Sequence, residues 1–289
     1  MTFVVKSYVN QVREDLKKRM CGRALSRAIN YFLTMRITFL GTGTSHGIPI
    51  IGCPCAVCTS PNPKNRRNRT GVWIDGGENA SMIIDVSSEF RVGALQNGLK
   101  KLDFVLLTHT HSDHVSGLDD LRIFSQRSGK GIPILGDAAT LADIRSRFSY
   151  AFNPTKQYGG GVPQYELIEI SASIQIANLT ITPLPVMHGP EPILGFRIND
   201  FAFITDVTVI PESTLDLMKG LDVLALDCLR REPHSTHLCL DQSIAYAKRI
   251  GAKRTFFIHM THDLEHAQTE SELPPELRLA YDGLVMESR

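Results

Sequence analysis

The densest group of chemically active side chains lies in the stretch LLTHTHSDHVSGLDD, residues 106–120. Within six residues it holds His109, His111 and His114, with Asp113 between the last two histidines. Burying histidine or aspartate without a partner costs free energy, so packing alone does not account for this spacing. Imidazole and carboxylate groups are ligands of divalent transition metals, and the segment therefore predicts a metal site.

The same residue types recur where other short apolar runs end. The end of a strand holds a side chain rigidly outside the core, so several strands that end in this way indicate a shared functional edge. A single histidine at such a place is more often a satisfied or surface residue, but chance explains the whole set poorly. The four residues concerned are Asp85, His188, Asp206 and His259.

The spacing predicts two adjacent ions of zinc, manganese or iron. His109 and His111, two apart in an extended segment, project to the same side and can bind one ion. A carboxylate is needed between two neighbouring cations. Asp85 is expected outside the ligands, where it orients a ligand imidazole or the loop backbone. The expected sets are His109, His111 and His188 for the first ion and Asp113, His114 and His259 for the second, with Asp206 bridging both.

The elements that must position these groups begin at Met35. Strand-like runs separated by turn residues, with helical stretches between and after them, indicate sheets covered by helices, an α/β fold. We expect one domain over residues 35–289. The expected strands and hairpins lie within 35–45, 73–90, 102–114, 174–190, 193–207, 221–229 and 253–262, and the expected helices within 135–150 and 240–252.

A second cluster, GCPCAVC, places Cys53, Cys55 and Cys58 in the pattern C-x-C-x2-C. Three thiolates in a Gly- and Pro-rich loop are typical of a tetrahedral zinc site whose fourth ligand comes from elsewhere. The PCAVC part also fits half of the zinc deaminase signature. That signature requires H-x-E upstream, whereas His46 is followed by Gly47 and Ile48, which excludes the deaminase interpretation.

Composition and charge narrow the classes of protein to which this chain could belong. The 289 residues carry a net charge of +1, so no overall field favours nucleic acid or an anionic membrane. No apolar run reaches about 18 residues, so we expect no membrane span, and no signal-peptide pattern is present, so we expect a cytoplasmic protein. Residues 1–34 hold seven basic and two acidic residues, which leaves −4 for the rest. We expect this segment to form a basic amphipathic helical extension, with a transit peptide or a natural start at Met35 as alternatives.

The pattern H-x-H-x-D-H at 109–114, with Asp85 before it and His188, Asp206 and His259 after it in that order, resembles the metallo-β-lactamase superfamily. The resemblance covers nearly all of residues 35–289. It implies an αββα sandwich with a dinuclear metal site on one edge. The fold alone does not fix the reaction, because this superfamily hydrolyses lactams, thioesters, lactones and phosphodiesters.

The cysteine pattern is similar to that of one group within this superfamily, the phosphoribosyl 1,2-cyclic phosphate phosphodiesterases of phosphonate degradation. The resemblance implies a structural zinc held by the three cysteines and a histidine near the last active-site ligand. FIHMTHD offers His259 for the dinuclear site and His262 for the structural zinc, and the reverse assignment stays open. It also implies a catalytic histidine after the Asp-Cys strand end, for which His237 aligns better than His234.

We therefore expect a metal-dependent phosphodiesterase with two divalent ions, Zn or Mn, in the active site and one structural Zn. A metal-bridging hydroxide would attack a small, preferably cyclic, phosphodiester, with Asp113 and His237 as catalytic residues and His237 as general acid. A tRNA 3′-processing ribonuclease, a lactonase or thioesterase, and a non-catalytic zinc-stabilised binding protein are the alternatives. We expect no membrane or nucleic-acid partner and a possible homodimer. Candidate contacts to a distal phosphate are Arg66, Arg67, Arg69, Arg230 and Arg231.

Overall fold

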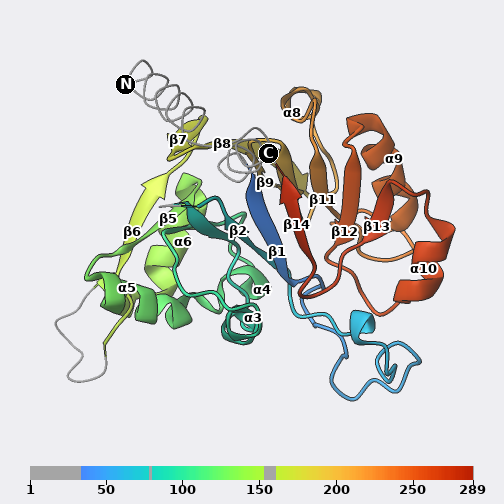
Figure 1. Ribbon diagram of the computed structural model, residues 1–289, viewed down its shortest axis with the longest axis horizontal. Helices are drawn as coiled ribbons and strands as arrows, with labels where there is room; N and C mark the ends of the chain where they lie inside the picture. The colour runs from blue at the N-terminus through green and yellow to red at the C-terminus, as the bar shows by residue number, and fades with distance from the viewer. Residues whose placement is uncertain (1–33, 78–79, 153–160, 289) are drawn as a thin grey trace, which may run out of the picture.

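The computed structural model describes residues 34–77, 80–152 and 161–288, so the extension predicted for 1–34 lies almost wholly outside the described residues. Two seven-stranded sheets form the centre of the molecule (Figure 1). In spatial order the first contains β14 (Val285–Ser288), β1 (Met35–Gly41), β2 (Gly71–Asp75), β3 (Ser81–Ile84), β4 (Phe104–Leu106), β5 (Ile132–Gly136) and β6 (Tyr165–Glu169). The second contains β13 (Leu277–Leu279), β12 (Arg254–Ile258), β11 (Val223–Asp227), β10 (Phe201–Ile204), β9 (Glu191–Ile198), β8 (Leu179–His188) and β7 (Ile174–Ile176).

Helices cover the outer face of each sheet. Buried side chains of α3, α5 and α6 pack on the first sheet, and those of α8 and α9 pack on the second. The longest helix of the described residues, α9, combines a hydrophobic buried side with basic residues in its last turn. The helices are α3 (Phe90–Gln96), α4 (Ser112–Val115), α5 (Arg122–Ser128), α6 (Ala138–Arg147), α7 (Ser149–Phe152), α8 (Glu212–Leu217), α9 (Leu240–Ile250) and α10 (His266–Glu272), with short 3-10 turns at Pro63–Asn65 and Leu118–Leu121.

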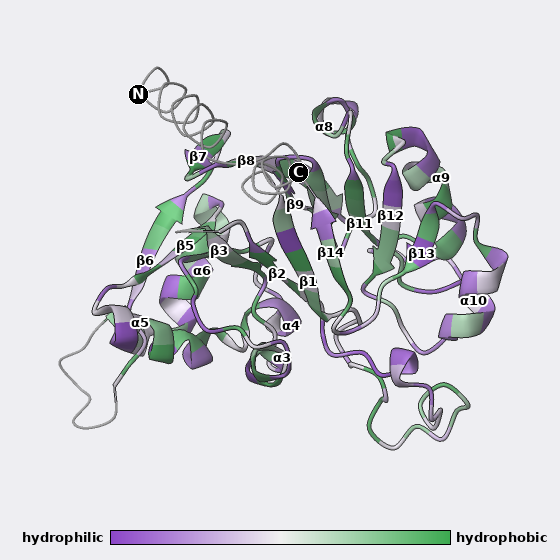
Figure 2. Ribbon diagram, in the orientation of Figure 1, coloured by the Kyte–Doolittle hydropathy of each residue, from purple (hydrophilic) through white to green (hydrophobic). Residues whose placement is uncertain are grey.

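Three hydrophobic clusters separate these four layers. The central one lies between the sheets and contains Phe39 and Ile74 of the first sheet together with Phe196 and Phe203 of the second. Figure 2 shows hydrophobic residues along β6 and β11, whereas α9 and α10 mix hydrophilic and hydrophobic residues. The predicted αββα sandwich is confirmed. No helix in the described part of the chain is long and apolar enough to cross a bilayer.

Strand direction brings the predicted polar residues to one edge. Strands β3 to β6 run parallel to one another, as do β10 to β13. Strand β8 is antiparallel to β9, and β9 is antiparallel to β10, so β8 and β10 point the same way. The carboxyl ends of β8, β10, β11 and β12 therefore meet at one edge of the second sheet, which is where ligands bind in sheets of this kind.

The loop after β3 and the histidine segment are joined by backbone hydrogen bonds. The Val86 N–H donates to the carbonyl of His114 at 2.7 Å, and the Gly117 N–H donates to the carbonyl of Val86 at 2.9 Å. A Cβ atom on Gly117 would lie 2.0 Å from the Ser87 carbonyl oxygen, so this approach requires glycine. The close contact fixes α4 against the loop that follows Asp85.

We expect Gly117→Ala to destabilise the protein by about 1–3 kcal/mol, because the Ser87 carbonyl must move to admit the methyl group. Urea unfolding monitored by tryptophan fluorescence measures the change. Gly131→Ala is the matched control, because its added Cβ makes only ordinary contacts of 3.4 Å or more. Equal loss of stability in the two variants would contradict the close approach described for Gly117.

Candidate metal centre

The carboxylate of Asp206 lies between two groups of histidines. Its Oδ2 atom is 3.8 Å from Nε2 of His109, and its Oδ1 atom is 3.3 Å from Nε2 of His114 and 3.4 Å from Nε2 of His259. Asp206 is 2% exposed, and its Oδ1 also accepts a hydrogen bond from Thr205. A carboxylate that faces a different group with each oxygen has the geometry of a bridging ligand.

Three sets of ligand atoms include this carboxylate. In each set the four ligand atoms lie within 4.8 Å of one another. In the second set, Oδ2 of Asp113 is 3.3 Å from Nε2 of His114 and 3.5 Å from Nε2 of His259. The first two sets are His109, His111, His188 and Asp206, and Asp113, His114, Asp206 and His259, so the structure brings together the side chains that the sequence groups; the third set is Asp206, Asp227, His237 and His259.

Three residues of the centre have left-handed backbone conformations. Asp85, Asp206 and His259 have φ angles of 60°, 55° and 58°, although none is a glycine. Each follows a strand of the shared edge, after β3, β10 and β12 respectively. Non-glycine residues adopt this conformation at a cost of about 1–3 kcal/mol and concentrate at functional sites. The turned backbone holds each side chain at the position seen here.

The Nδ1 atoms of His114 and His188 form hydrogen bonds on the side of each ring that faces away from Asp206. Asp85 accepts from Nδ1 of His114 at 2.7 Å, and the same carboxylate accepts from the Thr108 backbone N–H at 2.9 Å. Nδ1 of His188 donates to the Thr236 carbonyl at 2.8 Å. These contacts fix the tautomer and direct Nε2 inward, as in proteins that bind metal through histidine. Asp85 thus lies where it was predicted, behind a ligand imidazole.

The inward-facing Nε2 atoms of His109, His114 and His259 are buried, and within the described residues they have no hydrogen-bond partner. Leaving a buried polar atom without a partner costs about 1–3 kcal/mol, so three such atoms around one carboxylate call for a further group. Separations from the carboxylate oxygens of 3.3–3.5 Å for His114 and His259, and of 3.8 Å for His109, match ligand atoms around divalent ions. The residues therefore fit metal ions.

The charges of the site follow from these contacts. Burial raises the pKa of Asp113, but the nearby His114 and His259 imidazoles outweigh it and hold the pKa far below its usual value. Burial lowers the pKa of His109 well below its usual value, and the neighbouring His114 lowers it further. Burial also opposes protonation of His114, yet Asp206 and Asp85 raise its pKa. Protons and cations thus compete for the same nitrogens.

Sequence reasoning missed Asp227, the last residue of β11. It is fully buried, and its Oδ1 lies 3.6 Å from Nδ1 of His259 and 3.5 Å from Nδ1 of His237, while Oδ2 accepts from the Leu238 N–H at 3.0 Å. His237 is buried with its Nε2 3.9 Å from Oδ2 of Asp206, whereas His234 is half-buried. The signal was available, because Asp227 ends an apolar run just as Asp85 does.

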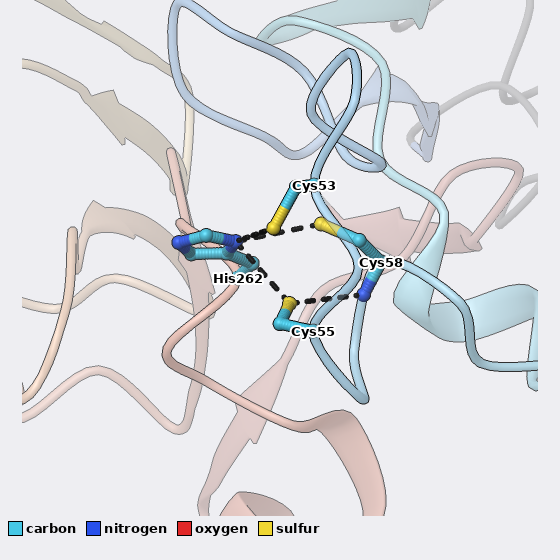
Figure 3. A group of neighbouring side chains, drawn as sticks. All are labelled: Cys53, Cys55, Cys58 and His262. Atoms are coloured by element: carbon cyan, nitrogen blue, oxygen red, sulfur yellow. Dashed lines mark hydrogen bonds between the residues drawn. The ribbon is translucent and has the colours of Figure 1, made fainter.

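The three cysteines lie around one nitrogen. Figure 3 shows Cys53, Cys55 and Cys58 from one loop facing His262 from the segment after β12. Their Sγ atoms are 3.5, 3.4 and 3.4 Å from Nδ1 of His262. Bonds of about 2.3 Å to sulfur and about 2.0 Å to nitrogen at the tetrahedral angle separate the two atoms by about 3.5 Å. The cluster therefore has the size of a zinc site, and His262 rather than His259 is the histidine that completes it.

The segment after the cysteines clamps the loop that carries His262. The Arg67 guanidinium donates to the backbone carbonyls of Thr261 and Leu264, both at 2.6 Å, and the side-chain Oδ1 of Asn65 accepts from the His266 N–H at 2.8 Å. Arg67 is only 1% exposed, and burial lowers its pKa to about 10. The prediction that Arg67 contacts a substrate phosphate is wrong, because its side chain is buried and both Nη1 and Nη2 donate to backbone carbonyls.

The other four arginines, Arg66, Arg69, Arg230 and Arg231, are exposed or half-buried and remain candidates for contacts to a substrate phosphate. Arg69 binds the Ser45 carbonyl, Ser88 and Glu89, and Arg231 pairs with Glu272. Arg66 is exposed. Arg230 donates to the carbonyls of Glu232 and Pro233.

Comparisons with known proteins agree with this geometry. A protein-family model described as a Beta-lactamase superfamily domain matches residues 72–260. A crystal structure of a new diphosphatase from the PhnP family is 39% identical, with a TM-score of 0.81 over 88% of this chain and 97% of that one. The short form of human tRNase Z shares the fold at 19% identity and a TM-score of 0.64, covering 87% of this chain and 98% of that one.

One curated relative carries a different name. An octanoyltransferase of Porphyromonas gingivalis (strain W83) is 38% identical over 254 residues, which cover 86% of this chain. The chain spans about half of that protein, 51% of its length. The name octanoyltransferase therefore belongs to a protein in which a region about as long as the matched one lies outside the match.

His266, at the start of α10, lies in the loop that Arg67 and Asn65 hold, and its protonation couples the stability of the protein to pH. It is 2% exposed, neither ring nitrogen has a hydrogen-bond partner within the described residues, and its ring meets Tyr281 edge-on. Burial lowers the pKa of His266 to about 4, with smaller contributions from Lys64 and Arg67 and opposing ones from Glu270 and Glu265. The unfolded chain therefore binds this proton more readily than the folded protein between about pH 6.5 and pH 4.

We expect the wild type to lose stability relative to His266→Phe as pH falls from about 6.5 to about 4, by at most about 1.4 kcal/mol per pH unit. A low folded-state pKa for a base means that stability is present above pH 6.5 and lost on acidification. Urea unfolding of both proteins in the presence of a chelator at pH 4, 5, 6 and 7 measures the difference. Parallel pH profiles would show that His266 is not buried in its neutral form.

Proposed function

The chain belongs to the metallo-β-lactamase superfamily, near the PhnP family, and is a metal-dependent hydrolase; from that premise we propose that it hydrolyses a small phosphodiester. The proposal rests on one observation, the buried carboxylate of Asp206 shared by two groups of histidines at one sheet edge. Two adjacent divalent ions suit a phosphodiester, because they can neutralise both nonbridging oxygens of the same phosphate. The similarity to a diphosphatase of the PhnP family, 39% identical, also supports phosphate chemistry.

The two groups would hold zinc or manganese, with His109, His111 and His188 at one position, Asp113, His114 and His259 at the other, and Asp206 between them. Bound there, two such ions lower the pKa of water towards about 7 and neutralise charge on the phosphate. The protein supplies the geometry, because Asp85, Thr236 and Asp227 lie behind the imidazoles. The cysteine cluster with His262 would hold a structural zinc.

His237 is proposed as the general acid. Its Nε2 lies near Oδ2 of Asp206, at the inner face of the site, while Asp227 lies behind its Nδ1. A proton held on Nε2 can pass to the oxygen that leaves phosphorus, a step worth about 10²–10⁴ in rate. Oδ1 of Asp227 lies within ion-pair distance of both His237 and His259, so one buried carboxylate faces both the proposed acid and the second metal position.

Hydrolysis of an acyl thioester is the second candidate. The name of the 38% identical octanoyltransferase favours it, although the chain matches only half of that protein. The same metal geometry can activate water against a carbonyl carbon. Initial rates with bis-p-nitrophenyl phosphate, octanoyl-CoA and a lactone separate the candidates, and activity confined to the thioester would overturn the phosphodiesterase proposal.

We expect Asp206→Ala to lower kcat/KM for bis-p-nitrophenyl phosphate by more than about 100-fold, since even residues that only support ligands cost 10–100-fold. The active-site metal content should fall in the same variant. Asp200→Ala is the matched control, because Asp200 lies in the turn at the opposite end of β10. Unchanged kinetics in Asp206→Ala would remove the shared carboxylate from the mechanism.

We expect Cys55→Ser to lose about one zinc per chain and to melt at a lower temperature, because metal binding contributes to folding at such sites. Elemental analysis and thermal unfolding measure both effects. Ala56→Ser adds the same hydroxyl to an exposed position of the same loop and should change neither. Wild-type zinc content and melting temperature in Cys55→Ser would show that the thiols are not ligands.

A further inference from the structure

A second histidine stands beside the proposed acid and has no part in the mechanism described so far. The His234 ring lies 5.2 Å from the His237 ring, centroid to centroid, and His237 lies 4.9 Å from His188. His234 is half-buried, whereas His188 and His237 are buried. The three rings thus form a row that leads from the metal groups outward to solvent.

Thr236 fixes the position of His234 in this row. The backbone N–H and the hydroxyl of Thr236 lie 3.3 and 3.2 Å from Nδ1 of His234, while the carbonyl of Thr236 accepts from Nδ1 of His188. A Cβ on Gly189 would lie 3.0 Å from the Thr236 methyl group, so this contact is close. One residue therefore holds both the innermost and the outermost histidine of the row.

These contacts also fix which nitrogen of His234 carries hydrogen. A backbone N–H can only donate, so Nδ1 of His234 must accept, and the hydrogen of the neutral ring is on Nε2. Nε2 makes no hydrogen bond or ion pair recorded within the described residues. His234 thus offers a donor that is free to bind an acceptor on a ligand.

The surrounding loop adds positive charge. Arg230 donates from Nε and Nη2 to the carbonyls of Glu232 and Pro233, just before His234, and its Nη1 makes no hydrogen bond to another described residue. Glu232, the one carboxylate between residues 230 and 237, is exposed. A guanidinium beside a neutral N–H donor is a combination that suits phosphate oxygens.

We propose that His234, backed by Arg230, binds a second phosphoryl group on the leaving side of the scissile bond, so that the substrate is a diphosphate diester. The inference rests on the proposed function. His237 donates to the leaving oxygen, and His234 is the next ring outward, within reach of a phosphoryl group attached to that oxygen. A substrate with a single phosphate leaves this position without a ligand.

The reaction balances without a further reactant. The oxygen of water bonds to the inner phosphorus, and the bond from that phosphorus to the bridging oxygen breaks. The bridging oxygen leaves with the outer phosphoryl group and takes the proton from Nε2 of His237, while the attacking water loses a proton. One diphosphate diester and one water thus yield two phosphate monoesters.

The test compares ADP-ribose, a diphosphate diester, with bis-p-nitrophenyl phosphate, which has one phosphate, in the metal-loaded full-length protein. We expect His234→Ala to lower kcat/KM for ADP-ribose by about 10- to 100-fold, mainly through KM, because a hydrogen bond to a charged group is lost. The loss with bis-p-nitrophenyl phosphate should be at least several-fold smaller. His234→Gln should restore much of the loss, since its amide N–H2 reaches about as far as Nε2.

Ser235→Ala, at an exposed position of the same loop, controls for loop disturbance, and thermal unfolding checks that each variant is folded. Equal losses with both substrates, or no loss with ADP-ribose, would overturn the proposal. So would a wild type that cleaves bis-p-nitrophenyl phosphate and not ADP-ribose, although the proposed phosphodiesterase function would then stand. A metal-loaded wild type that cleaves neither overturns both.

Discussion

A buried carboxylate surrounded by imidazoles is the constraint on which the rest of this structure depends. Removing the charge of Asp206 from water costs several kcal/mol, and that cost must be offset by positive charge nearby. Protonated histidines supply part of that charge, since His114 and His259 lower the pKa of Asp206 well below its usual value although burial raises it. Divalent ions would supply more, and they would do so while leaving the imidazoles neutral. The inward Nε2 atoms without hydrogen-bond partners are consistent with that arrangement.

The cysteine cluster and the metal centre are mechanically connected. His259 belongs to the metal centre and His262 to the cysteine cluster. Between them, the Met260 backbone pairs with the loop after β1, donating to Thr42 and accepting from Thr44. Arg67 and Asn65, which follow the cysteines in sequence, hold the same loop from the other side. A zinc at the cysteines would therefore tie down the loop whose left-handed residue, His259, serves the active site. The segment 259–262 therefore contributes both to the stability of the fold and to the geometry of the active site.

Much of the centre could be predicted because its chemistry is local in sequence. The H-x-H-x-D-H spacing and the rule that His or Asp ends a strand pointed to seven side chains that the structure brings together, and the same rule applied to LDVLALD would have found Asp227. Arg67 could not be placed in this way. A run of basic residues normally indicates a solvated surface, and only the fold shows that loop 261–266 encloses this guanidinium. Likewise, the sequence spacing does not tell whether His234 or His237 lies deeper in the site. In the structure, the contact of Thr236 with His188 leaves His234 one ring further out than His237.

The central claim is that these side chains hold two adjacent cations. Anomalous X-ray scattering at the zinc and manganese edges, from a crystal of protein purified and supplemented with both metals, tests it most directly. The account predicts two neighbouring peaks on either side of Asp206 and a separate zinc peak within the cysteine cluster. A single peak beside Asp206, or none, in fully supplemented crystals would contradict it.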